Sequence, residues 1–164
     1  MEDLSGTDLR SVGMEGRDLH GINLRCADLC MANLYLADLS GADLREANLS
    51  GASLGTVNFR NVDLRNADFS GADLSGADLT GTRLNRADLR GADLRGACPL
   101  EADLSGADLC GALVDGTILY GICLSMADLR GSELMGLVIR DAAALNGADI
   151  RGATNVPCFA AAMG

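Results

Sequence analysis

Residues 71–80 read GADLSGADLT, so that one five-residue unit stands twice in succession. The unit centres on Leu74 and then on Leu79, and each leucine follows an Ala-Asp pair. The same phase runs from Leu4 to Ile139 and gives 28 central positions, of which 24 are Leu or Phe. The exceptions are Met14, Pro99, Val114 and Ile139. A register held over this length makes the chain a tandem repeat, so that the repeat unit, and not local periodicity, determines the fold.

The other positions of the unit are also regular. A small residue lies two positions before most centres, Asp or Asn usually lies directly before the centre, and Gly lies two positions after it at 16 of the 28 units. A period of five suits neither a helical stripe nor the alternating faces of a strand. Every fifth side chain can point to a common axis if the chain winds into a coil with short straight sides. Coils of that kind stack on one another and bury a continuous core.

Ala42-Asp43-Leu44-Arg45-Glu46 and Ala72-Asp73-Leu74-Ser75-Gly76 resemble the motif A(D/N)LXX of the pentapeptide-repeat family. The resemblance covers about residues 2–153. It implies an all-β fold, the right-handed quadrilateral β-helix, with four pentapeptides in each coil. With four units per coil we expect about seven to eight coils and, at about 4.8 Å between stacked strands, a rod on the order of 37 Å long.

We predict one domain over residues 1–153, followed by a cap or tail at 154–164. After Ile139 the phase moves by one residue, to Leu145 and Ile150, so that a bulge or loop is expected within 140–144. The glycines after the centres predict tight corners, where φ is positive or a side chain would clash. Pro99 at a centre predicts a local kink, with Leu100 either turned outward or brought inward by a change of register.

Composition narrows the function. The 164 residues hold 23 acids and 13 bases, a formal net charge of −10, which argues against direct binding to nucleic acid or to an anionic membrane. Apolar runs fall far short of the roughly 20 residues that cross a bilayer. Because the repeat begins at Leu4, we expect no signal peptide and a cytoplasmic protein with reduced thiols.

Residues 20 apart should stack on one face of the rod, and one such column is acidic. Its members are Asp8, Asp28, Asp68, Asp88, Asp108 and Asp128, with Asn48 between them. Some members of the resembled family imitate duplex DNA and bind type II topoisomerases such as DNA gyrase. The charge here is roughly one per 3.7 Å of rod, about half the density of a duplex. The alternative is that these side chains accept hydrogen bonds from nearby backbone N–H groups.

Outward positions turn apolar toward the C-terminal end. The predicted apolar interface consists of Cys98, Leu100, Leu113, Ile118, Tyr120, Met135 and Val138. A contiguous exposed apolar patch usually marks an interface. Three coverings are open: the segment 154–164 folded back as a cap, a second copy in a homodimer, or another protein. Cys30, Met31, Tyr35 and Leu36 form a smaller apolar group.

Few residues of this sequence are candidates for a catalytic role. His20 is the one histidine, and its neighbours on the repeat lattice are Gly and Asp, so we expect an outward, solvated side chain. The six cysteines form no CxxC pair, and Cys30 and Cys110, which share a column, stand about 19 Å apart, beyond the roughly 7 Å limit for a disulfide. We predict no catalytic, cofactor or metal residues. The expected function is a non-enzymatic interaction scaffold that binds a protein partner or itself; the alternatives are a DNA-mimic modulator of a type II topoisomerase and a structural spacer.

Overall fold

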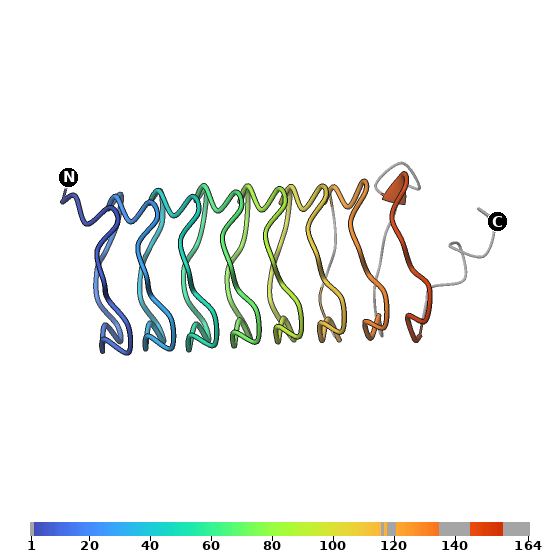
Figure 1. Ribbon diagram of the computed structural model, residues 1–164, viewed down its shortest axis with the longest axis horizontal. Helices are drawn as coiled ribbons and strands as arrows, with labels where there is room; N and C mark the ends of the chain where they lie inside the picture. The colour runs from blue at the N-terminus through green and yellow to red at the C-terminus, as the bar shows by residue number, and fades with distance from the viewer. Residues whose placement is uncertain (1, 116, 118–120, 135–144, 156–164) are drawn as a thin grey trace.

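The computed structural model describes residues 2–115, 117, 121–134 and 145–155. Similar coils stack along one axis, and the first and last described residues lie at opposite ends of the rod (Figure 1). Parallel bridges join residues 20 apart, and within one coil they begin at Asp3, Asp8, Gly13 and Asp18. Each pentapeptide therefore forms one of four sides. Every strand in the described residues is a single bridging residue, because a corner follows two positions after each centre.

The core is the axis of the rod, where central residues meet the small residues that precede them. Leu44 and Leu64, which stack one above the other, are both completely buried, as are most central side chains. Phe59 and Phe69 also point inward, with an edge-to-face arrangement and ring centroids 6.0 Å apart. The predicted all-β coil with a filled axis is confirmed. Within the described part of the chain, no helix has the length and apolar character to cross a membrane.

A regular pentapeptide inside the stack satisfies all five of its backbone N–H groups, as residues 27–31 illustrate. Ala27 N closes a turn onto the preceding central carbonyl at 3.0 Å, and Asp28 N donates to the preceding coil at 2.9 Å. Leu29 N and Met31 N donate to the following coil at 2.7 and 3.0 Å. Cys30 N faces neither coil, and it donates instead to the Asp28 side chain, at 3.2 Å. Asp or Asn before the centre is therefore the acceptor that completes the backbone pairing.

The corner position, two residues after the centre, has positive φ wherever the structure describes it from Gly6 to Gly131. Together with the turn hydrogen bond this is a type II turn, which requires positive φ at its third residue. At Gly71, φ is 65° and no atom lies within 4 Å of the place that a Cβ would take. Backbone conformation alone favours glycine there, and the predicted clash is wrong for that position.

Two irregularities leave the stack intact. Pro99 is buried at its central position, and the next coil keeps the 20-residue spacing, since Arg83 pairs with Asp103. Beyond Leu134 the spacing becomes 21, because Asp128 pairs with Asp149. The extra residue therefore lies after Leu134 and before Leu145, and the segment 140–144 to which we assigned it lies outside the described residues.

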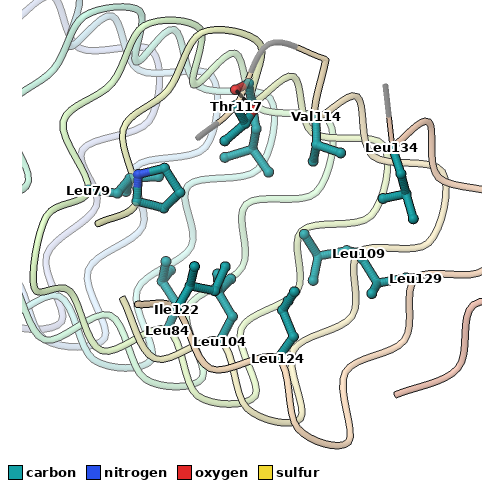
Figure 2. Close-up of a pocket in the computed structure, with 12 residues that line it drawn as sticks. Leu79, Leu84, Leu104, Leu109, Val114, Thr117, Ile122, Leu124, Leu129 and Leu134 are labelled. Carbon is teal, nitrogen blue, oxygen red and sulfur yellow. Dashed lines mark hydrogen bonds between the residues drawn. The ribbon is translucent and has the colours of Figure 1, made fainter. Parts of the chain in front are cut away.

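An internal cavity of about 20 Å³ occupies the axis near the C-terminal coils (Figure 2). Its lining includes Pro99, Val114 and Ile122, which stand among leucines, and Thr117, whose hydroxyl donates to the Leu94 carbonyl at 3.0 Å. Val114 is smaller than the Leu that fills most centres, so the cavity is a packing defect. A volume close to that of one water molecule, with apolar walls, gives no room for a ligand.

Candidate functional site

The acid column is real as a stack: consecutive bridges join Asp8, Asp28, Asn48, Asp68, Asp88, Asp108 and Asp128, and the series continues to Asp149. Each of the six acids named in it accepts the N–H two residues further on, at 2.8–3.2 Å. The alternative role expected for this column, to accept hydrogen bonds from nearby backbone N–H groups, is thus observed directly. The carboxylates are fixed by the backbone that they complete.

Arginines neutralise part of this column. Wherever the sequence reads Asp-Leu-Arg, the guanidinium folds back onto the carboxylate with two donors, as Arg130 does on Asp128 at 2.9 and 2.6 Å. Arg10 contacts Asp8 in the same way, and this hydrogen bond lowers the pKa of Asp8 from 3.8 to about 2. Arg90 likewise holds the pKa of Asp88 below its usual value. Arg10 and Arg90 also reach Asp28 and Asp108, at 3.6 and 3.8 Å, so that Asp68 is the acid of the column with no arginine at ion-pair distance in the described residues.

The predicted apolar interface is described only in part. Cys98 and Leu100 are half-buried, and Leu113 has 36% of its surface exposed. Ile118, Tyr120, Met135 and Val138 lie outside the described residues, as does most of the segment 154–164. The interface and the three coverings proposed for it remain predictions.

The smaller apolar group is fully described and well exposed. Met31, Tyr35 and Leu36 expose 63%, 41% and 55% of their surfaces, while Cys30 is half-buried. All of them follow the centres Leu29 and Leu34, so that they belong to two successive corners of one coil. We call Met31, Tyr35 and Leu36 the Met31 cluster. Elsewhere in the described residues, the large apolar side chains with such exposure are Leu113 and Met126.

His20 is exposed, as predicted, but its surroundings differ from the prediction. The ring Nδ1 lies 3.0 Å from Ser40 Oγ on the next coil. The spacing of 20 residues was the signal that could have found this pair. Asp38 Oδ1 accepts the Ser40 N–H at 2.9 Å, and the Ser40 hydroxyl bond lowers the pKa of Asp38. The pair is exposed and forms a surface hydrogen bond between two coils.

Cysteines and metal ligands add no site in the residues described. Cys26, Cys30, Cys98, Cys110 and Cys123 are free thiols. No group of three or more His, Cys, Asp or Glu side chains within the described ranges is arranged to hold a metal ion.

A second surface feature escaped the sequence analysis. Arg65, Asn66, Asn85, Arg86 and Ser105 line a polar depression of about 460 Å³. The signal was present in residues 82–86, Thr-Arg-Leu-Asn-Arg, where an arginine replaces the usual Asp or Asn and a second one occupies the corner. The depression joins three successive coils.

The stacked single-residue bridges, the buried leucines and the left-handed corners define a four-sided parallel β-solenoid. The family model described as pentapeptide repeats (8 copies) matches three stretches of the chain, residues 22–61, 58–96 and 101–136. The chain belongs to the pentapeptide repeat family, whose fold is the right-handed quadrilateral β-helix predicted from the sequence.

Solved structures agree with this assignment. HetL of the cyanobacterium Nostoc sp. PCC 7120, a pentapeptide repeat protein involved in heterocyst differentiation regulation, is 29% identical over 90% of this chain and 84% of its own, with a TM-score of 0.65. Rfr23 of Cyanothece 51142 is 26% identical over 76% of this chain and 89% of its own, with a TM-score of 0.57. The alr5209 protein of Nostoc PCC 7120 is 36% identical over 63% of this chain and 84% of its own, with a TM-score of 0.55. A comparison with curated proteins found no match.

Proposed function

We propose that the protein is a non-enzymatic interaction scaffold, a rigid acidic rod that binds a protein partner through the Met31 cluster. The observation that supports this proposal is the exposure of three large apolar side chains on one coil. Aromatic and methionine side chains are enriched at protein interfaces. The regulatory role of HetL, a similar rod, supports a function exerted through contacts.

The backbone of the rod supports this function physically. Coil-to-coil hydrogen bonds run in register through the described residues, and central side chains fill the axis. A rod built in this way presents its corners with little rearrangement, which lowers the entropic cost of binding. The proposal needs no catalytic group: His20 and Ser40 form the one described Ser-His pair, and they stand on open surface.

DNA mimicry receives less support from the column on which it rests. The carboxylates of Asp8, Asp88 and Asp128 are each bound by an arginine two residues further on. A ligand for a DNA-binding surface needs those charges free to face cationic groups of the partner. The acid column is accounted for by its role in the backbone.

The test replaces the cluster with residues that suit its backbone. Met31→Asn, Tyr35→Ser and Leu36→Asn are combined, because Asn tolerates the left-handed conformation of the corners at 31 and 36. Met126→Asn is the matched control: it is also an exposed methionine at a left-handed corner, with its sulfur over the glycine of the next coil.

Wild type and both variants are compared by sedimentation velocity and by quantitative affinity purification, with circular dichroism to verify folding. We expect a stoichiometric partner to be retained by wild type and by the Met126 control and lost from the triple variant. If self-association is what the triple variant loses, the partner is a second copy. Identical profiles for all three folded proteins would remove the Met31 cluster from the function.

A further inference from the structure

Positive charge accumulates on one corner of this acidic rod, where the residues after Leu24, Leu44, Leu64 and Leu84 stack. Three arginines there have carboxylates of their own: Arg25 pairs with Glu46 at 2.9 Å, Arg45 with Asp43 at 2.5 Å and Arg65 with Asp63 at 2.7 Å. On the next coil two further arginines follow, beside Asp63 and the stacked Asp103.

Arg83 and Arg86 are those two arginines. Arg83 Nη1 lies 3.9 Å from Asp63 Oδ2, but that carboxylate already accepts both donors of Arg65 and also has Arg45 Nε at 3.9 Å. One acid therefore faces three guanidinium groups. Arg86 has no carboxylate partner among the described residues. Counting Asp63 and Asp103 against Arg65, Arg83 and Arg86, the charge around this point is +1, although the whole chain carries −10.

The polar depression lies at this point. Arg65 uses Nε and Nη2 on Asp63, which leaves both hydrogens of Nη1 free. Asn85 Nδ2 donates to Ser105 Oγ at 2.7 Å, and both side chains also hydrogen-bond the Asp103 carboxylate. The Arg86 side chain extends along the rod, with Cγ 3.6 Å from the place that a Cβ on Gly106 would take. Arg65 Nη1 and the Arg86 guanidinium are thus without a carboxylate in the described residues, and they border the depression from two successive coils.

The lining carries two cations, although Asp103 adjoins it and is hydrogen-bonded by Asn85 and Ser105. Its five residues, Arg65, Asn66, Asn85, Arg86 and Ser105, include two cations, two carboxamides and a hydroxyl, and none is a carboxylate. Guanidinium groups form strong, charge-assisted hydrogen bonds with oxyanions. A planar carboxylate is satisfied by one arginine, whereas the tetrahedral oxygens of a phosphate group can accept from several directions.

We propose that this depression binds an oxyanion of the phosphate type, either the free ion or a small phosphate monoester. Arg86 supplies the unpaired charge, Arg65 Nη1 a second guanidinium edge and Asn66 a neutral donor. The proposal is independent of the Met31 cluster, which follows different centres on another coil.

The experiment is a titration of ¹⁵N-labelled full chain, followed by amide and arginine side-chain NMR shifts at pH 7.5 and constant ionic strength. Inorganic phosphate, phosphoserine and chloride are the three ligands. We expect saturable shifts at residues 65, 66, 85, 86 and 105 with a low-millimolar dissociation constant for a phosphate ligand and none with chloride. Saturation by the free ion, by the monoester or by both identifies the source of the group.

Arg86→Gly is the decisive variant, because glycine suits the positive φ of this corner and the protein should fold at least as well. Loss of one charge-assisted contact should weaken binding about tenfold. Glu101→Gly is the matched control, a charged corner residue replaced in the same way on another face, and it should titrate like wild type. Equal shifts with phosphate and chloride, or unchanged affinity in folded Arg86→Gly, would overturn the site.

Discussion

The acid column provides both negative charge and backbone pairing, and substitutions of Asp68 can separate these two roles. Asp68 Oδ1 accepts the Ser70 N–H at 2.8 Å, and no arginine lies within ion-pair distance of it among the described residues. Asp68→Asn removes the charge and keeps an acceptor, as Asn48 does naturally in the same column, where it accepts the Ser50 N–H at 3.0 Å. Asp68→Ala removes both.

We expect Asp68→Ala to lower the free energy of unfolding by about 1 kcal/mol, the usual net worth of one hydrogen bond, and Asp68→Asn to change it by only a few tenths. Extending the change to Asp28 and Asp108 should make the Ala series cost about 3 kcal/mol, because sites two coils apart are nearly additive.

Urea unfolding followed by circular dichroism measures these differences. Since repeat proteins can unfold in parts, the midpoint and the slope are both compared between variants. Asn and Ala variants that are equally destabilised would show that charge, not pairing, is what the column provides. A neutral Ala series would show that water satisfies the freed N–H groups, and would refute the account of the fifth donor.

Three further predictions concern the core, a corner and acid. Val114→Leu should fill the axial cavity of about 20 Å³ and raise the unfolding free energy by about 0.5–0.8 kcal/mol. A lower urea midpoint would mean that the larger side chain overpacks the axis, and would contradict this prediction. Thr56→Gly should stabilise by about 1 kcal/mol because a β-branched residue there has φ 53°; a lower thermal midpoint would contradict the strain argument. Arg10 and Arg151 lower the pKa values of Asp8 and Asp149 from 3.8 to about 2. Since the folded-state values are the lower ones, their stabilisation is complete above about pH 3.8 and lost as pH falls through about 2, so a urea midpoint constant from pH 5 to 2 would disprove it.

The axis and the faces of the rod could be predicted because the repeat is strict. A five-residue spacing that places Leu44 twenty residues before Leu64 leaves few ways to bury both, and both are buried in one stack. The register slip was also visible, since Leu145 and Ile150 leave the earlier phase. Its exact place was not, because a loop between two coils is not constrained by the lattice that defines them.

Side-chain partners were harder to predict than columns. That His20 reaches Ser40 depends on how the ring leans over the next coil, with Cε1 3.6 Å from the place that a Cβ on Gly41 would take. The excess charge at Arg86 depends on which carboxylates are already engaged. Both are properties of rotamers across coils, whereas the repeat pattern fixes only the position of each Cα.

Both of the proposed binding surfaces use the two residues after each centre. The centre and the small residue before it fill the axis, and Asp or Asn before the centre completes the backbone, as Asp28 does for Cys30 N. These positions are similar on every face and distinguish none of them. The Met31 cluster and the anion site proposed at Arg86 are both made of the two variable positions. Transplanting the pair Tyr35-Leu36 onto residues 75–76 should consequently move the apolar contact two coils along the rod without disturbing the stack, apart from the strain of a second left-handed leucine.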